Sequence, residues 1–362
     1  MTLIKNINRR HFLKQSVPAA GALVVPGLLL QATEPFANKL ITRGVVLITD
    51  DLETLDWPLM ARESKLTTIG THISPEQVKK FVGTERGQTF LSDCKRYKIN
   101  VEHELHAMHD LLPRKLFDKN PEMFRMNKDG VRVADYNCCT NSTQALEIIS
   151  ENAVRYAEVL TPTTMRFFYW IDDAVPMCYC DHCRNLSDSD QALIIENAMI
   201  RALRKVYPNA SLAHLAYVNT LKPPTQVKPE EGIFLEFAPI YRRWDKPITD
   251  REAGIKSPKQ GQGGFFSHGE TIDLLYANLE VFPPGTAQVL EYWLDVSLQS
   301  KWKKPAQKIS WHPDVCKQDV EFYNKCGIRH ITTFAAYIDG TYKNTYKDTR
   351  FVNEYGSILR KI

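Results

Sequence analysis

After residue 40, short runs rich in β-branched and aromatic residues alternate with longer amphipathic runs, and this alternation limits the possible folds more than any other feature of the sequence. The short runs are residues 43–50, 67–74, 100–107, 166–172, 212–218, 233–240, 287–295 and 330–338. The longer runs are residues 75–97, 142–160, 189–207, 269–282 and 313–326, followed by a last one from about 347 to 359. Such alternation predicts strand–helix units that build a parallel sheet.

The number of units favours one parallel architecture. Eight strand–helix units over about 320 residues are typical of a closed (β/α)8 TIM barrel rather than an open doubly wound sheet. No GxGxxG follows the first predicted strand, so the usual sign of a dinucleotide-binding fold is missing. The residues at the predicted helix ends agree with these helix boundaries. Ser74, Ser142 and Ser189 stand at N-cap positions, and Gly327 stands at a C-cap position. We expect residues 40–362 to form a single α/β barrel domain.

The N-terminus differs in charge from the rest of the chain. Residues 1–32 hold four basic residues and no acidic one, which accounts for the formal net charge of +4. The remaining chain is nearly neutral, and this argues against nucleic acid or an anionic membrane surface as its main partner. The segment NRRHFLK at 8–14 is similar to the twin-arginine export motif, and an apolar stretch at 17–30 follows it. Two prolines interrupt that stretch, which is too short for a stable membrane anchor.

We therefore expect residues 1–32 to be a twin-arginine signal peptide that binds the twin-arginine translocase and is cleaved near Ala32. The mature protein would then be periplasmic or secreted. The alternative interpretation is a frayed basic N-terminus followed by a core helix. No later stretch of the sequence is long and apolar enough for a transmembrane helix.

Five cysteines lie in two short segments. CYCDHC places Cys178, Cys180 and Cys183 at C-x-C-x2-C spacing, and Cys138 and Cys139 stand about 40 residues upstream. Three thiolates so close, joined by one of the upstream pair, can form a tetrahedral four-cysteine site for structural zinc. Disulfides are the alternative in an exported protein. A twin-arginine substrate folds in the reducing cytoplasm, however, and a C-x-C disulfide closes a strained loop, so we expect zinc.

Carboxylates stand at the ends of several predicted strands, on the side where barrel enzymes build their active sites. Asp172 and Asp173 end the fourth strand, Glu236 lies on the sixth, and Glu291 and Asp295 lie on the seventh. Sugar-cleaving barrels use one such group to protonate the leaving oxygen and a second as nucleophile, base or positioning group. The strand-end carboxylates are therefore candidate catalytic residues.

Each single carboxylate also has a structural alternative, because it could cap a helix or pair with Arg242 or Arg243. On the seventh strand, an alternation of period two should place Glu291, Trp293 and Asp295 on one face. We expect that face to point into the active site.

Aromatic and histidine residues are frequent near the same strand ends. Flat aromatic faces can stack on sugar rings, although many aromatic side chains simply fill a barrel core. The third strand leads into HELHAMH, which lacks the HExxH pattern, so we favour sugar contacts over a metal site there. The residues expected to contact a substrate are His103, His106, Tyr217, Asn219, Tyr292, Trp293 and Asp295.

Several stretches, taken in order, resemble a known family. They are HELHAMHDLLPRKLF, NPEMFRMNKDGVR, CCTNSTQ, YWIDDAVPMCYCDHC and YPNASLAHLAYVNTLKPP. This set is similar to domain-of-unknown-function family 4838, from about residue 65 to 340. The resemblance implies a TIM-barrel glycoside hydrolase related to glycoside hydrolase family 163, whose members are endo-β-N-acetylglucosaminidases acting on complex N-glycans. The family often has an Asn-Asp pair at Asp172-Asp173, and a Glu beyond the sixth strand where this chain reads IYRRW.

Residues and resemblance together predict a glycoside hydrolase acting on β-linked N-acetylhexosamine-containing glycans. In the preferred scheme Asp173 donates the proton and Asp172 polarises the acetamido group of the substrate. In the competing scheme Glu291 is the nucleophile opposite Asp173, and Glu236 is a further candidate carboxylate. Two other functions remain open: a carbohydrate-binding barrel without catalysis, and a metal-dependent sugar isomerase that uses the histidines of the third strand with Glu236.

Replacing both signal arginines should stop export. In the double variant Arg9→Lys/Arg10→Lys, the precursor should accumulate in the cytoplasm, because the translocase recognises the arginine pair. Immunoblots of cytoplasmic and periplasmic fractions measure this, with Lys5→Arg as a control that keeps the pair. An unchanged periplasmic yield in the double variant would contradict a twin-arginine signal.

Overall fold

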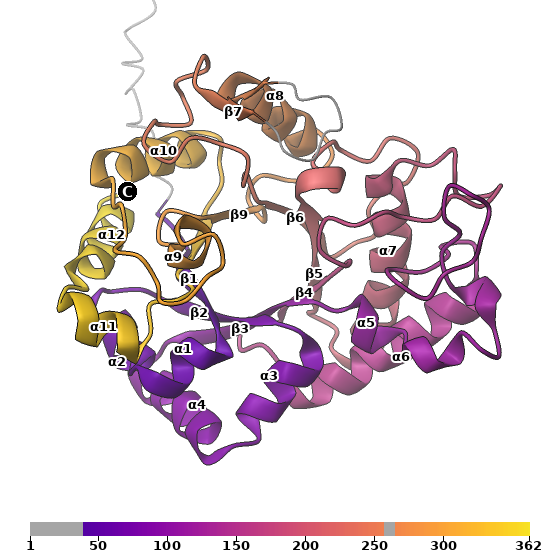
Figure 1. Cartoon of the computed structure of the whole chain (residues 1–362), viewed down its shortest axis with the longest axis horizontal. Coiled ribbons are helices and arrows are strands. Elements are labelled where there is room, and N and C mark those ends of the chain that lie inside the picture. The colour runs from indigo at the N-terminus through magenta and orange to yellow at the C-terminus, as the bar shows by residue number, and fades with distance from the viewer. Residues whose placement is uncertain (1–38, 257–264) are drawn as a thin grey trace, which may run out of the picture. The chain divides into compact units, whose positions relative to one another are not determined.

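The computed structural model describes residues 39–256 and 265–362, so the predicted signal peptide at 1–32 lies outside the described residues. Within them, eight parallel strands close into a barrel in the order β1-β10-β9-β6-β5-β4-β3-β2, and Figure 1 looks down this ring of strands. The predicted (β/α)8 barrel is confirmed. The barrel strands are β1 (Thr42–Ile48), β2 (Thr68–Ile73), β3 (Asn100–His106), β4 (Arg166–Trp170), β5 (Ser211–Ala216), β6 (Ile233–Phe237), β9 (Gln288–Glu291) and β10 (His330–Phe334).

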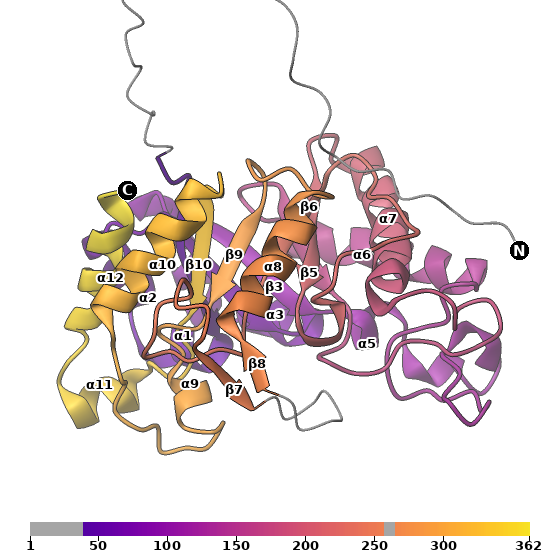
Figure 2. The same ribbon diagram turned by 90° about the horizontal axis from the view of Figure 1, so that it is seen from above.

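Helices surround the strands, and Figure 2 shows α8 and α10 running along the outside of the barrel. The α-helices are α1 (Thr49–Thr54), α2 (Trp57–Glu63), α3 (Pro75–Val82), α4 (Glu85–Tyr97), α5 (Met108–Leu111), α6 (Thr143–Val159), α7 (Asp188–Val206), α8 (His268–Leu279), α9 (Val296–Gln299), α10 (Pro313–Lys325), α11 (Gly340–Tyr346) and α12 (Arg350–Arg360). The described residues also form three short 3-10 helices, η1 (Arg114–Leu116), η2 (Pro121–Met123) and η3 (Val218–Thr220). None of the helices in the described ranges has the length and apolar character needed to cross a membrane.

Two short strands stand apart from the barrel. β7 (Gly254–Lys256) and β8 (Phe265–Ser267) pair antiparallel in the long connection between β6 and α8. The sequence predicted an irregular segment there. The short helices α1 and α2 between β1 and β2 were also not expected, because neither is long enough to show a helical period.

Side-chain caps fix several helix ends as predicted. Ser74 accepts a hydrogen bond from the amide of Gln77, and Ser142 accepts one from the amide of Ala145. The expected cap at Ser189 is wrong, because α7 begins two residues earlier with Ser187 as its N-cap. The hydroxyl of Ser189 instead donates to backbone carbonyls of the loop that follows β5.

Several barrel strands end before their predicted runs do, and two of these ends bear on the site. β4 ends at Trp170 rather than at residue 172, and β9 ends at Glu291 rather than at residue 295. After β9 the chain turns, since the amide of Asp295 donates to the carbonyl of Tyr292 over 3.1 Å. The expectation that Glu291 and Asp295 share a strand face is therefore wrong.

The apolar core has two parts. The larger fills the space between the strands and the surrounding helices, and it includes buried side chains such as Trp57, Phe90 and Tyr355. The smaller lies inside the barrel and includes Phe168 and Phe234, whose rings meet edge to face. Layers of large side chains therefore fill part of the barrel interior, as is usual for this fold.

Charged side chains fill the rest of the interior. Arg166 lies 3.7 Å from Glu102 and donates to Gln288 over 3.2 Å. Glu104 and Glu236 face the same network, and the amide of Gln288 donates to Glu236 over 2.9 Å. Burial raises the pKa of each of the three glutamates, because a low-dielectric interior disfavours the ionised carboxylate. The Arg166 guanidinium therefore balances the charge of one glutamate carboxylate, and the other two glutamates are more stable as neutral acids.

The packing of α12 against the end of α2 gives a test of the fold. A Cβ at Gly356 would lie 1.8 Å from the carbonyl oxygen of Ser64, which is backbone and cannot move aside easily. Gly356→Ala should therefore lower the free energy of unfolding by about 2 kcal/mol, since overpacking outweighs the gain in helix propensity. Thermal melting of the purified protein measures this. Gly285→Ala is the control, because nothing lies within 4 Å of its Cβ position, and an equal loss in both variants would contradict the packing argument.

Candidate functional site

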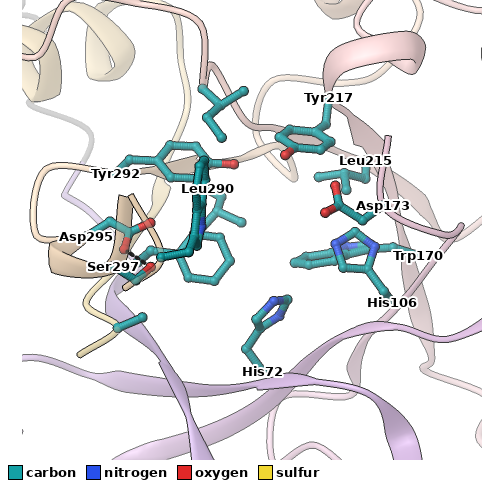
Figure 3. A pocket seen from close by; sticks show the side chains of 14 residues that line it. His72, His106, Trp170, Asp173, Leu215, Tyr217, Leu290, Tyr292, Asp295 and Ser297 are labelled. Carbon is teal, nitrogen blue, oxygen red and sulfur yellow. Dashed lines mark hydrogen bonds between the residues drawn. The ribbon is translucent and has the colours of Figure 1, made fainter. Parts of the chain in front are cut away.

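A cavity of about 200 Å³ opens at the carboxyl ends of the barrel strands. Strands β2, β3, β4, β5, β9 and β10 each contribute a side chain to its wall. The other lining residues come from α9 and from loops beyond the strand ends, including the loop after β6. Figure 3 shows these side chains pointing toward a common centre. The lining residues are His72, His106, Trp170, Asp173, Leu215, Tyr217, Ile240, Leu290, Tyr292, Asp295, Ser297, Trp302, Phe334 and Ala336.

Two carboxyl groups face this cavity from different loops. Asp173 follows β4, and Asp295 follows β9. Figure 3 shows them on opposite sides of the cavity, with Asp173 beside Tyr217 and Asp295 beside Ser297. Two acids facing one space from opposite sides are the arrangement that glycosidic bond cleavage requires.

Asp173 is exposed at the cavity rim, in a turn that departs from extended backbone. The next residue, Ala174, has a φ of +49°, which turns the chain away from the barrel. The hydroxyl of Tyr217 lies close to Asp173, and burial together with the Asp173 charge raises the pKa of that hydroxyl. Tyr217 therefore stays protonated and can donate a hydrogen bond at the rim.

Asp295 is buried and firmly positioned. It is the N-cap of α9, and its Oδ1 accepts hydrogen bonds from the hydroxyl of Ser297 over 2.5 Å and from the amide of Leu298 over 3.1 Å. Burial raises the pKa of Asp295 to about 6, although these hydrogen bonds favour the charged form. Its carboxyl group therefore titrates just below neutral pH.

Two histidines and a tryptophan form one wall of the cavity. The Nδ1 of His72 donates to the carbonyl of Glu104 over 2.7 Å, and the Nδ1 of His106 donates to the carbonyl of Ile171 over 2.8 Å. Both rings contact Trp170, with centroid distances of 5.7 and 5.1 Å. Burial lowers the pKa of His72 to about 4, and the neighbouring His106 adds to this shift. His72 is thus neutral at neutral pH, with an unprotonated Nε2 that can accept a hydrogen bond from a ligand hydroxyl.

Asp172 does not line this cavity, although its neighbour in sequence does. It accepts a hydrogen bond from Arg114 over 3.0 Å and another from the amide of Asn137 over 2.7 Å. The side chain of Asn137 accepts in turn from the amide of Asp172. Asp172 therefore joins two loops, and the structure does not bring it to the place where the predicted acetamide polariser should stand.

The candidate carboxylates Glu236 and Glu291 also lie away from the cavity. Glu236 belongs to the charged interior of the barrel and accepts a hydrogen bond from the indole of Trp170 over 2.8 Å. Glu291 is buried behind the sheet, where it accepts from Arg242 over 2.8 Å and from the hydroxyl of Tyr323 over 2.5 Å. The predicted role of Glu291 as a nucleophile is not supported, because its carboxylate is committed to this ion pair outside the cavity.

The expected substrate contacts divide into two groups. His106, Tyr217, Tyr292 and Asp295 line the cavity. The other three lie elsewhere. His103 faces outward from β3 and hydrogen-bonds Thr71 on β2, while Asn219 donates to Asp188, and the indole of Trp293 donates to Asp319 behind the sheet.

His103 and His106 lie on opposite sides of β3, since three positions separate them on a strand. In the described ranges, the one group of His, Cys, Asp and Glu side chains placed to share a metal ion consists of cysteines. The metal site that a sugar isomerase needs is therefore not present among these histidines and Glu236.

Nine of the fourteen cavity residues were not predicted as site residues, and His72, Ser297, Trp302 and Phe334 are among them. His72 could have been predicted from the sequence, since it stands two positions after Gly70 on β2 and shares the inward face of that strand. Trp302 could not have been predicted in this way, because it lies in an irregular segment after α9.

The cysteine cluster is a separate feature. Cys139, Cys178, Cys180 and Cys183 are all buried, and their sulfur atoms lie within 4.8 Å of one another. Cys139 is 3.7 Å from Cys180 and 3.9 Å from Cys183, measured between Sγ atoms. The upstream ligand candidate is therefore Cys139, whereas Cys138 packs into the main apolar core instead.

Comparisons with known proteins agree with the architecture. A family model described as "Domain of unknown function (DUF4838)" matches residues 65–261, which is more than half of the chain. No curated protein matches the sequence. The matched residues include His72, His106, Asp173 and the cysteine cluster, while Asp295 lies beyond them.

Solved structures with a similar fold share little sequence with this chain. A Group II chitinase catalytic domain from Ostrinia furnacalis is 9% identical, covers 89% of this chain and 97% of its own, and gives a TM-score of 0.51. A GH5-4 endoglucanase from an uncultured bacterium is 12% identical, with coverages of 89% and 95% and a TM-score of 0.49. A β-N-acetylhexosaminidase from Bacteroides fragilis is 11% identical, with a TM-score of 0.47, and the match covers 88% of this chain but 65% of that chain. The chitinase likeness shows a shared barrel fold.

Proposed function

The chain belongs to the family described as domain of unknown function DUF4838, and from that membership and the geometry of its barrel mouth we propose that it is a glycoside hydrolase. The observation that carries the proposal is the pair of carboxyl groups, Asp173 and Asp295, that face one cavity from different loops. Hydrolysis of a glycosidic bond needs one acid to protonate the leaving oxygen and one carboxylate near the anomeric carbon.

The rest of the cavity suits a sugar ring. Trp170, Tyr217 and Tyr292 offer aromatic surface, and His72 and His106 offer imidazole nitrogens for hydroxyl groups. A volume of about 200 Å³ is below the roughly 300–1000 Å³ that drug-sized ligands occupy. The cavity therefore fits one sugar residue rather than a larger ligand.

The two acids are suited to different roles. Asp173 stands at the exposed rim, where a leaving group can depart into solvent, and we assign it the role of proton donor. Asp295 is buried beside α9, and with a pKa of about 6 it is mostly ionised at neutral pH. It supplies the negative charge that stabilises the developing positive charge on the sugar.

The substrate class that we propose is a β-linked, N-acetylhexosamine-containing glycan, cleaved as by an endo-β-N-acetylglucosaminidase. This rests on the motifs that resemble the glycoside hydrolase family 163 branch. Apolar side chains also line the cavity, namely Leu215, Leu290 and Phe334, and they can accept the methyl group of an acetamido substituent. The polariser role predicted for Asp172 passes to Asp295, the second carboxyl group that faces the cavity.

Removing either cavity acid should abolish most turnover. Asp173→Asn and Asp295→Asn should each lower kcat/KM for a chromogenic N-acetylglucosaminide by at least about a hundredfold, the usual contribution of a positioned acid or carboxylate. Asp314→Asn, an exposed carboxyl on α10, is the matched control. Unimpaired hydrolysis by the Asp173 variant would overturn the assignment. A wild-type protein that binds glycans but never cleaves them would support a binding barrel instead.

The pH profile tests the role of Asp295. If its carboxylate must be ionised, kcat/KM of the wild type should rise as the pH increases through about 6. A fall of kcat/KM through that range would instead identify Asp295 as the proton donor.

We further propose that the cysteine cluster holds one structural zinc ion. Tetrahedral zinc with Zn–S bonds of about 2.3 Å places its sulfur ligands about 3.8 Å apart, and the distances of 3.7 and 3.9 Å from Cys139 agree with this. A disulfide needs about 2.05 Å. The amide of Met126 also donates to Cys178 over 3.3 Å, a contact that stabilises a thiolate ligand. Zinc would tie the loop before α6 to the loop after β4.

Metal analysis tests the zinc proposal. The purified protein should carry about one zinc ion per chain, and Cys180→Ser should lose the metal and unfold at a lower temperature, because metal binding adds to folding stability. Cys326→Ser, at the end of α10 and outside the cluster, should keep the metal. Stoichiometric disulfides without zinc would refute the proposal.

The proposal for where in the cell the enzyme acts rests on the twin-arginine motif alone. We propose that the enzyme is exported by the twin-arginine translocase and works in the periplasm or outside the cell. Folding before export would let the cluster take up zinc in the cytoplasm.

A further inference from the structure

A second hollow adjoins the cavity, and we call it the side groove. It has a volume of about 530 Å³ and shares Ile240 and Trp302 with the cavity wall. Its other sides come from the loop after β6 and from the segment between α9 and α10. The two spaces therefore adjoin at Ile240 and Trp302.

Trp302 is held in an unusual way. Its side chain is 63% exposed, and the backbone of Lys301 and Trp302 is left-handed, with φ of +54° and +56°. Bulky residues rarely adopt this conformation, which costs free energy unless the surroundings fix it. Here the amide of Trp302 donates to the carbonyl of Ser297 over 2.7 Å, and its carbonyl accepts from the hydroxyl of Tyr337 over 3.4 Å. A single exposed aromatic residue is ordinary, but one held in a strained conformation between two hollows suits ligand contact.

The rest of the side groove lining combines aromatic and polar groups. Tyr241 and Trp244 come from the loop after β6. Arg243 and Asp245 form an ion pair with hydrogen bonds of 2.9 and 2.5 Å, and both side chains remain exposed. His312 also lines the side groove. Aromatic faces beside exposed polar groups can bind the apolar face and the hydroxyls of a pyranose ring.

We propose that the side groove binds the next sugar residue of an oligosaccharide whose neighbouring residue occupies the cavity, with Trp302 as the stacking surface. This inference rests on the proposed function, because it takes the cavity to bind a sugar. It adds where the second sugar residue binds, and that the protein gains affinity and turnover from that residue. A monosaccharide glycoside uses the cavity alone.

Binding to the Asp173→Asn variant tests this without cleavage of the ligand. Isothermal titration calorimetry compares N-acetylglucosamine with its β-1,4-linked dimer. The dimer should bind at least about tenfold more tightly, because a favourable aromatic contact is worth about that factor. Adding Trp302→Ala should remove this gain, and adding Trp302→Phe, which keeps an aromatic face, should retain most of it. Adding Tyr276→Ala, an exposed aromatic residue on α8, is the control and should leave the gain intact.

The outcomes separate the two proposals. Equal affinity for monomer and dimer, or a gain that survives Trp302→Ala, overturns the side groove as a subsite while leaving the cavity assignment intact. Binding of neither sugar contradicts the proposed substrate and the inference that rests on it. Melting temperatures of the Trp302 variants should match that of their parent, since the substitutions change an exposed side chain and not the backbone.

Discussion

A buried arginine holds the barrel mouth in place. Arg242 is 1% exposed, and its guanidinium donates to Glu291 at the end of β9 and to Asp319 on α10, over 2.8 Å in each case. Removal of one partner from such a buried ion pair costs about 3–5 kcal/mol, because the remaining charge is left without compensation. The pair fixes the loop after β6, with Ile240, against the strand end that precedes Tyr292, and both of these residues line the cavity. The geometry of the site therefore depends on buried charges that do not line the cavity.

The barrel could be predicted from the sequence because each strand and each helix leaves a pattern within its own segment. The alternation of strand and helix patterns is visible in each segment. Six barrel strands fall within the predicted runs, and β1 and β5 each begin one residue before theirs. Strand ends were less certain, because they depend on partners distant in the sequence. The run at 287–295 continues to look like a strand, but the ion pair of Glu291 and the turn at Asp295 end it early. Two candidate catalytic residues were thereby separated onto different sides of the sheet.

The functional site, like the fold, could be predicted from the sequence in part. The family motif and the strand position favoured Asp173, which does line the cavity, whereas the contacts of Asp172 with Arg114 depend on a loop about 60 residues away in the sequence. The C-x-C-x2-C spacing indicated a cysteine cluster, but the orientation of Cys139 relative to Cys138 follows from tertiary packing. Spacing shows which residues are neighbours in the chain, and it cannot show which of two adjacent side chains turns toward a distant partner.

Buried glutamates in the barrel interior keep their protons to a higher pH in the folded protein than in the unfolded chain. Glu102 lies nearest to Arg166 and balances its charge, while Glu104 and Glu236 are most stable when protonated. The unfolded chain releases such protons near pH 4.5, and Glu236 in the folded state holds its proton to about pH 8. Between those values the folded state binds more protons than the unfolded one, so the contribution of these groups to stability falls as the pH rises. A rise in pH toward 8 should therefore lower the stability of the fold through these buried groups, and added salt should screen this effect very little.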